Sequence, residues 1–242
     1  MKILAFDSTA KTASVALAEN EKILAVMTAS NGLTHSEILL PMAENVCARA
    51  KVALSEVDYY AVTVGPGSFT GVRIGVATVK GLAFRIPEDE ERRCVAVSTL
   101  ESLGQNLFPL DGIYAAVMDA RRSEVYNALF VAKDGALVRL SPDRAISLEE
   151  LAEELLTAYP DTPVRLVGDG YDVALDYLRK KGVPLSETPV ALRAQNAGSI
   201  ALCAYRMIQN GETVSDKALS PVYLRLPQAE RERLEKLKEN KA

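Results

Sequence analysis

The sequence repeats one succession of elements in its two halves. Each half opens with an apolar stretch that ends in an aspartate, Asp7 or Asp119, and continues through a polar turn into two further stretches with strand character. An amphipathic helical segment, a short apolar stretch, a glycine-containing turn and a second helical segment follow in each half. The expected strands and first helices are 3–7, 14–18, 22–28, 35–50 and 59–64 in the first half, and 114–119, 124–131, 136–139, 147–158 and 164–167 in the second. Two β-β-β-α-β-α units predict an α/β fold with two mixed-sheet subdomains, each flanked by helices.

The break between the two units lies between Phe108 and Gly112, where a proline and a glycine bracket the joint. We therefore expect an N-terminal subdomain of residues 1–110 and a C-terminal subdomain of residues 111–227. The second contains a strong helical pattern, 196–210, that stops at Gly211. The last segment, 228–242, is rich in Glu, Lys and Arg, which predicts a charged tail or a solvated helix.

A glycine-rich segment, 65–75, joins an apolar strand to the next helical pattern. Glycine has no Cβ and tolerates positive φ, so a ligand or another backbone can approach closely there. The segment lacks the closing Lys and Ser or Thr of a P-loop, and its spacing does not fit a Rossmann fingerprint. Gly71 and Gly75 instead lie on one helical stripe, against which a neighbouring helix could pack. This pattern favours close packing or partner contact, while phosphate contact and a simple tight turn remain open alternatives.

The composition narrows the class of protein. The chain has 242 residues, 48% of them hydrophobic, and a formal net charge of −4 with scattered basic residues. This balance does not indicate a polyanion partner, although a local patch could still bring nucleic acid close. No apolar run of about 18 residues predicts a membrane span, and the apolar start reaches Asp7 too early for a signal sequence. Cys47, Cys94 and Cys203 are far apart and odd in number, which favours buried thiols in a reducing compartment, here the cytoplasm.

The two strands that end in an acid resemble those of the actin, Hsp70 and sugar-kinase superfamily. In that fold, both acids and their turns flank a cleft that holds ATP phosphates and Mg²⁺. The turn at Asp7 is similar to the first phosphate-binding hairpin, but Arg121 stands where the second turn of the superfamily has glycine, so a guanidinium crowds the phosphate position. Arg121 could hold an anion. The resemblance thus implies at most a vestigial nucleotide cleft, formed by Asp7, Ser8, Thr9, Asp119 and Arg121.

A closer resemblance extends over nearly the whole chain. The segments 34–41, 65–75, 97–100, 119–121, 124–126 and 221–225 are similar to those of the TsaB, or YeaZ, family. That family is the non-catalytic paralogue of TsaD in the bacterial machinery that forms N6-threonylcarbamoyladenosine, t6A, at position 37 of tRNAs reading ANN codons. The resemblance implies a scaffold rather than an enzyme, which pairs with a TsaD-like subunit and a TsaE-like ATPase and meets tRNA through the complex. It also implies a homodimer when the partner is absent and no cofactor of its own, with ATP and metal on the partner subunits.

The single histidine of the chain agrees with a non-catalytic role. TsaD holds its metal with two histidines at positions i and i+4 of one helix. Here Leu39 stands four residues after His35, so a two-histidine metal site cannot be built. We expect His35 at a helix terminus or an interface. Although the family has been classified with glycoproteases, the chain lacks the usual metal pair, Ser-His or Cys-His machinery for peptide hydrolysis.

Two helical stripes are candidates for the partner surface. They comprise His35, Leu39, Met42 and Val46 on one helix, and Phe69, Gly71, Val72, Gly75, Val76 and Val79 on the next. Burial against the chain's own sheet would explain both stripes equally well. The family resemblance, in which these helices form a four-helix bundle with TsaD, favours partner contact and predicts that a charged residue at Gly75 or Val76 blocks pairing without unfolding the chain. The alternative function is an ATP-dependent phosphotransferase or ATPase that uses Asp7 and Asp119.

Overall fold

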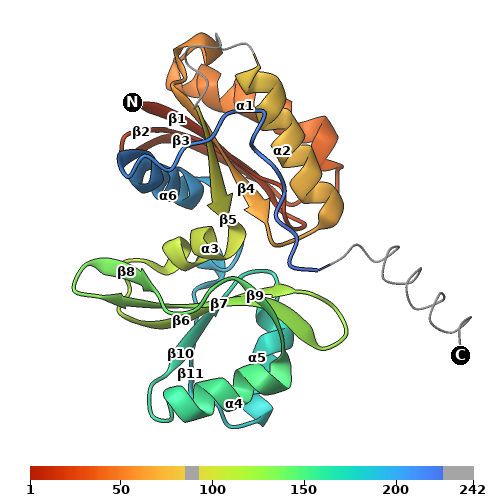
Figure 1. The fold of residues 1–242 in the computed structure, drawn as a ribbon, viewed down its shortest axis with the longest axis vertical. Helices are drawn as coiled ribbons and strands as arrows, with labels where there is room; N and C mark the ends of the chain where they lie inside the picture. The colour runs from red at the N-terminus through yellow and green to blue at the C-terminus, as the bar shows by residue number, and fades with distance from the viewer. Residues whose placement is uncertain (85–92, 226–242) are drawn as a thin grey trace, which may run out of the picture.

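The computed structural model describes residues 1–84 and 93–225, which form two α/β halves stacked along the long axis of the molecule (Figure 1). The first half is built on a five-stranded sheet with the order β3-β2-β1-β4-β5. Its strands are β1 (Lys2–Asp7), β2 (Ala13–Glu19), β3 (Lys22–Ala29), β4 (Tyr59–Gly65) and β5 (Cys94–Ser98). The first three strands pair antiparallel, whereas β4 and β5 continue the sheet in parallel with β1.

The second half repeats this topology. Its sheet has the order β8-β7-β6-β10-β11, and β9 adds an antiparallel pairing to β7. The strands are β6 (Gly112–Asp119), β7 (Glu124–Lys133), β8 (Ala136–Arg139), β9 (Arg144–Ser147), β10 (Val164–Val167) and β11 (Leu185–Ser186). Three antiparallel strands are again followed by two parallel ones, in the same spatial order as in the first half. The duplication predicted from the sequence is confirmed, and with it the actin-, Hsp70- and sugar-kinase-like fold.

Both faces of the first sheet are covered by helices. Leu4 and Phe6 of β1 pack with α1 (His35–Ala50) and α2 (Phe69–Ala83) on one face. Ile3 and Ala5 point to the opposite face, where α6 (Ala197–Gln209) covers them. Because a strand presents successive side chains to opposite faces, a strand buried on both sides reads as a continuous apolar run.

The second sheet is covered in the same way. Helices α4 (Leu148–Ala158) and α5 (Tyr171–Lys180) pack on its outer face, and α3 (Thr99–Leu107) packs on the inner face. Helix α4 begins with a capping box, since Ser147 Oγ accepts from the backbone N of Glu150, and Glu150 Oε2 accepts from the backbone N of Ser147, both at 3.1 Å. Ser147 also ends β9, a strand that the sequence analysis missed.

The two halves exchange their third helices. Helix α3 follows the first sheet in sequence but packs on the second, and α6 follows the second sheet but packs on the first. These two helices also contact each other in the middle of the molecule (Figure 1). The division at residue 110 therefore remains a prediction about sequence units, because the core of the first half includes residues from 197 onward.

A C-terminal segment, residues 214–225, runs back along the first half. Val214 forms a β-bridge with Cys94, Leu219 is buried, and the backbone N of Val222 donates to Val64 O at 2.8 Å. The segment ends at Arg225, which forms an ion pair with Glu124 of the second half. The predicted charged tail, 228–242, lies outside the described residues. Within the two described stretches, no helix is long and apolar enough to cross a membrane.

Candidate functional site

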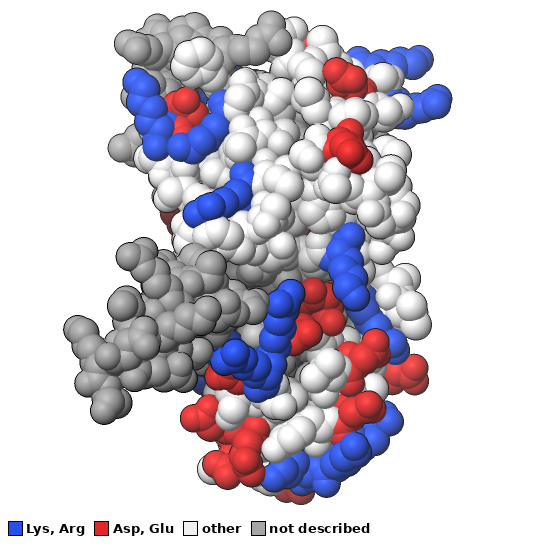
Figure 2. Space-filling model, turned by 90° about the vertical axis from the view of Figure 1, so that its right-hand side faces the viewer, with Lys and Arg blue, Asp and Glu red and all other residues white. Residues whose placement is uncertain are grey.

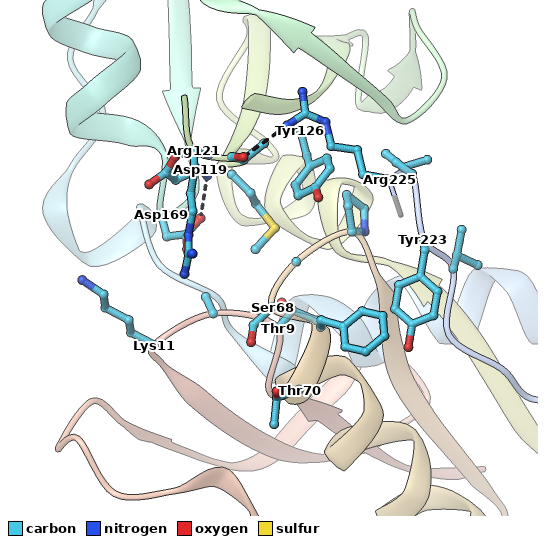
Figure 3. Close-up of a pocket in the computed structure, with 18 residues that line it drawn as sticks. Thr9, Lys11, Ser68, Thr70, Asp119, Arg121, Tyr126, Asp169, Tyr223 and Arg225 are labelled. Carbon is cyan, nitrogen blue, oxygen red and sulfur yellow. Dashed lines mark hydrogen bonds between the residues drawn. The ribbon is translucent and has the colours of Figure 1, made fainter. Parts of the chain in front are cut away.

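A cleft of about 460 Å³ lies where the two halves meet (Figure 3). The first half contributes the turn after β1 and the glycine-rich start of α2, the second half contributes the turns after β6 and β10, and the segment at 222–225 closes one side. The lining residues are Thr9, Ala10, Lys11, Pro66, Gly67, Ser68, Phe69, Thr70, Met118, Asp119, Ala120, Arg121, Tyr126, Asp169, Val222, Tyr223, Leu224 and Arg225. Asp119 and Arg121 face Thr9, Lys11 and Ser68 across the cleft. The duplicated fold thus brings the ends of equivalent strands together, as the sequence predicts.

Asp7 does not line this cleft, although the sequence analysis placed it there. Its side chain is fully buried, and its carboxylate accepts hydrogen bonds from the backbone N of Thr9 at 2.8 Å, from Thr9 Oγ1 at 2.9 Å and from Thr63 Oγ1 at 3.0 Å. Burial raises the pKa of Asp7 to about 6, against the lowering effect of these hydrogen bonds. A carboxylate that is buried and bonded in this way is a structural group, which weakens the alternative of a phosphotransferase that uses Asp7 and Asp119.

Ser8 is also buried, while Thr9 reaches the cleft wall. Ser8 Oγ donates to Gly71 O at 2.8 Å, so it ties the β1–β2 turn to α2. Of the five residues predicted for a vestigial nucleotide cleft, the structure therefore brings Thr9, Asp119 and Arg121 to the cleft. The other two, Asp7 and Ser8, are buried and do not line it.

The glycines of the 65–75 segment allow close packing inside the chain. A Cβ at Gly67 would lie 2.5 Å from Thr9 O, and a Cβ at Gly71 would lie closer still to Ser8 O. At Gly75, a Cβ would lie 2.6 Å from Ser8 Oγ. The prediction of close packing is confirmed, but the neighbour is the β1–β2 turn rather than another helix. The backbone N of Ser68 is already occupied by Thr9 O at 2.7 Å.

The turn after β6 differs in shape from a glycine turn. Arg121, Arg122 and Ser123 all have positive φ, at 63°, 56° and 59°, in the left-handed region that Gly, Asn and Asp enter most readily. The Asp119 carboxylate accepts from the backbone N of Arg121 at 2.7 Å and fixes the first residue of the turn. The Arg121 side chain thus occupies the side of the cleft where the superfamily has a glycine.

Asp169 is a cleft residue that the sequence analysis missed. It lies in the glycine turn after β10, and its Oδ1 accepts from the backbone N of Asp119 at 3.4 Å. Although Asp169 keeps some exposed surface, desolvation raises its pKa to about 6, and the negative charge of Asp119 acts in the same direction. The available signal was the repeat itself, since β10 occupies in the second half the place of β4 in the first.

A stacked cluster lies at the opposite side of the cleft. The rings of Phe69 and Tyr223 stack with their centroids 4.6 Å apart, and the Arg73 guanidinium lies 3.9 Å from the Phe69 ring centroid. Arg73 Nε also donates to Tyr223 Oη at 2.8 Å. Phe69, which was predicted for the partner surface, therefore holds the C-terminal segment against α2.

The apolar stripes predicted to bind a partner lie inside the protein. Their aliphatic members are at most 4% exposed and belong to the core of the first half; these are Leu39, Met42, Val46, Val72, Val76 and Val79. Gly71 and Gly75 are buried as well. Because Gly75 and Val76 are buried, a charged residue at either position would lie in the core, so we now expect such a change to disturb the fold as well as pairing.

His35 joins the start of α1 to the turn after β1. Its Nε2 donates to Ala10 O at 2.7 Å, and the side chain is half-buried. The position at a helix terminus agrees with the sequence analysis. In the part of the chain that the structure describes, no three His, Cys, Asp or Glu side chains gather as a metal site.

The outward sides of α1 and α2 carry other apolar and small residues. Leu40 is 44% exposed, and Ala48, Ala77 and Gly81 are exposed as well. Figure 2 shows that the half of the molecule that carries these helices presents a broad uncharged surface, with few Lys, Arg, Asp or Glu side chains. A surface with few charges and with exposed apolar residues such as Leu40 is typical of an interaction site.

Comparisons with known proteins match the chain along most of its length. The model of the family described as TsaD, tRNA N6-adenosine threonylcarbamoyltransferase, matches residues 26–232. The chain is 31% identical over 238 residues to a Bacillus subtilis (strain 168) protein named tRNA threonylcarbamoyladenosine biosynthesis protein TsaB, which covers 98% of this chain and 100% of the relative. An Escherichia coli (strain K12) protein of the same name is 30% identical over 227 residues, covering 93% of this chain and 95% of the relative.

Two solved structures from Pseudomonas aeruginosa agree with this similarity. One, described as an uncharacterized protein with similarity to peptidase YeaZ, has 30% identity and a TM-score of 0.74, and covers 93% of this chain and 99% of that chain. The other, described as YeaZ, has 28% identity and a TM-score of 0.72, and covers 92% and 99%. The named relatives and the solved structures match this chain over nearly its full length and over nearly their own full length. The chain therefore belongs to the TsaB (YeaZ) family.

Proposed function

We propose that this chain is a non-catalytic subunit of the machinery that forms t6A at position 37 of ANN-decoding tRNAs. Its full-length similarity to proteins named for t6A biosynthesis supports a role of the chain in this pathway. The chain has one histidine, and Asp7 is buried, which leaves neither the metal pair of TsaD nor the paired acids of a sugar kinase. The chain's part in the reaction is to hold a catalytic subunit in its active form.

The partner is a TsaD-like subunit, and the observation that carries this part of the proposal is the outer surface of α1 and α2, which lies in the sparsely charged half of the molecule (Figure 2). Leu40, Ala77 and Gly81 are exposed on these helices, and small residues let a second helix pair approach closely. The same surface forms a homodimer when the partner is absent. A TsaE-like ATPase completes the complex, ATP and metal bind on the partner subunits, and tRNA meets the complex in the cytoplasm.

In vitro transfer of threonylcarbamoyl to tRNA tests the pathway. The reaction contains TsaD, TsaE and the adenylate-forming enzyme, with and without this chain. We expect t6A to disappear when the chain is omitted, and no turnover by the chain alone. Unchanged modification in its absence would overturn the proposal.

A matched pair of variants tests the surface. Leu40→Glu on the outer side of α1 is expected to abolish co-elution with TsaD, because it places a charge in an apolar contact. Val173→Glu on α5, which is 47% exposed in the second half, serves as the control and is expected to pair normally. Pairing of the Leu40→Glu variant at wild-type affinity would show that another surface binds TsaD.

A further inference from the structure

The turn between β6 and β7 places two arginines in an unfavourable backbone conformation. Arg121, Arg122 and Ser123 are consecutive residues with positive φ. For L-residues other than Gly, Asn and Asp this region costs free energy, and natural chains keep such strain mainly where function requires it. Arg121 and Arg122 are both exposed, so the conformation serves neither side-chain burial nor core packing.

Neighbouring elements hold this turn in place. The backbone N of Ala120 donates to Glu124 O at 3.0 Å, and Arg225 Nη1 donates to Ala120 O at 3.2 Å. On the far side of the turn, the backbone N of Leu148 donates to Ser123 O at 3.1 Å. Contacts from β7, α4 and the C-terminal segment therefore fix the backbone of the turn that carries the two arginines. A turn whose backbone is already ordered loses less entropy on binding an anion than a mobile loop.

The acidic groups of the same region are engaged within the protein. Glu124 forms an ion pair with Arg225, and the Asp119 carboxylate accepts from the backbone N of Arg121. Asp169 accepts from the backbone N of Asp119. Figure 2 shows blue side chains on both sides of red ones at the level where the halves meet. Hydrogen bonds or an ion pair thus hold each of these three carboxylates against groups of the protein itself.

An aromatic surface lies on the other side of the cleft. Tyr223 is 40% exposed, and one of its faces is stacked on Phe69. The hydrogen bond from Arg73 to the Tyr223 hydroxyl fixes the ring, and Figure 3 shows Tyr223 on the wall opposite Lys11 and Arg121. Rigid exposed aromatic rings flanked by Arg and Lys are the surfaces on which unpaired bases stack.

We propose that the arginine turn and the Tyr223 ring together form a direct contact surface for RNA, with backbone phosphates on Arg121 and Arg122 and an unpaired base on Tyr223. The identification of this RNA as tRNA rests on the proposed function, whereas the surface itself rests on the geometry. Lys11, exposed on the same cleft, extends the cationic rim toward the first half. The inference goes beyond a scaffold that meets tRNA only through its partner.

The test is tRNA binding by the reconstituted complex with TsaD, measured by filter binding at two salt concentrations. Arg121→Glu/Arg122→Glu is expected to weaken binding by at least about tenfold and to reduce the salt slope by about 2, since two phosphate contacts are lost. Tyr223→Leu is expected to weaken binding with an unchanged salt slope. The matched control is Arg179→Glu/Lys180→Glu, which makes the same charge change at exposed positions in the last turn of α5.

Gel filtration of the same samples separates this inference from the proposed function. If the double variant pairs with TsaD and binds tRNA as tightly as wild type, the proposed RNA contact surface is wrong and the proposed function stands.

An equal loss of tRNA binding in the α5 control would also contradict the proposed RNA contact surface, because the effect would then be one of net charge. Weakened Mg·ATP binding with unchanged tRNA binding would identify a nucleotide site instead. If wild type itself fails to pair with TsaD, the proposed function fails, and binding of tRNA to the isolated chain then decides the surface separately.

Discussion

Gly71 lets α2 approach the turn after β1 more closely than any other residue would allow. A Cβ at this position would overlap Ser8 O, a backbone atom that cannot move without displacing the turn. Gly81 lies ten residues further along the same helix, and a Cβ there would meet nothing within 4 Å. The two glycines therefore have opposite energetic roles in one element.

Gly71→Ala is expected to lower the free energy of unfolding by about 2–3 kcal/mol, because overpacking forces α2 away from the turn. Gly81→Ala is expected to raise it by up to about 1 kcal/mol, because alanine is the better helix former and open space surrounds the position. Urea denaturation of both variants measures the difference. Equal effects of the two substitutions would contradict the packing described for Gly71.

Asp7 makes the stability of the first half depend on pH. Its pKa is about 6 in the fold, against 3.8 for an exposed aspartate, so the folded state holds the proton more tightly. The carboxyl therefore imposes no cost below about pH 4, and it lowers stability progressively as the pH rises through 6. At pH 7.5 the full cost is about 3 kcal/mol.

Asp7→Asn removes this dependence while keeping the shape of the side chain. The variant is expected to be more stable than wild type at pH 7.5, and the advantage is expected to shrink as the pH falls to 4. Thermal unfolding of both proteins across this range measures the difference. A constant offset between the two curves would show that Asp7 titrates normally in the fold.

At the scale of elements, α2 has an inner side that belongs to the core and an outer side that is free for a partner. Val76 is 4% exposed, whereas its neighbour Ala77 is exposed. Val76→Glu is expected to unfold the first half, with loss of far-UV circular dichroism. Ala77→Glu is expected to keep the spectrum and to weaken pairing by at least about tenfold, or about 1.4 kcal/mol. Pairing that survives Ala77→Glu would exclude the outer side of α2 from the interface.

The sequence predicts where helices and strands lie along the chain better than it predicts what each of them packs against. The bounds of α1, β8 and β10 agree with the prediction, because strong apolar periods and clear turns delimit them. The stripe that contains Val72 and Val76 was also recognised, but an apolar stripe has the same pattern whether it packs on its own sheet or on another protein. Strand β9 was missed because four half-buried residues carry no distinct period.

The candidate site was predicted in part for a similar reason. Asp119 and Arg121 were found because they end a recognisable strand, and the fold places them at the cleft. Asp169 and Tyr223 were not assigned to the site, because their proximity depends on how the second half and the C-terminal segment return to the first. Contacts between residues this distant in sequence leave no local pattern.

At the scale of the whole molecule, the exchange of α3 and α6 makes each half depend on the other. The face of the first sheet that carries Ile3 and Ala5 is covered by Ile200 and Ala204 of α6. A fragment of residues 1–110 therefore lacks the cover for one face of its sheet and is expected to show no cooperative unfolding transition. The control is residues 1–225, which keeps every described element and is expected to unfold cooperatively. A cooperative transition in the short fragment would contradict the dependence.

The position of α6 has a consequence for the order in which the protein acquires its structure during synthesis. The first sheet leaves the ribosome early, but the helix that seals its inner face is translated more than 80 residues after Gly112. One apolar face of the first sheet therefore stays exposed until the whole second sheet has been synthesised. During this time the nascent chain can bind chaperones or aggregate. A premature stop anywhere before residue 197 yields a chain without α6, in which the face of the first sheet that carries Ile3 and Ala5 stays exposed.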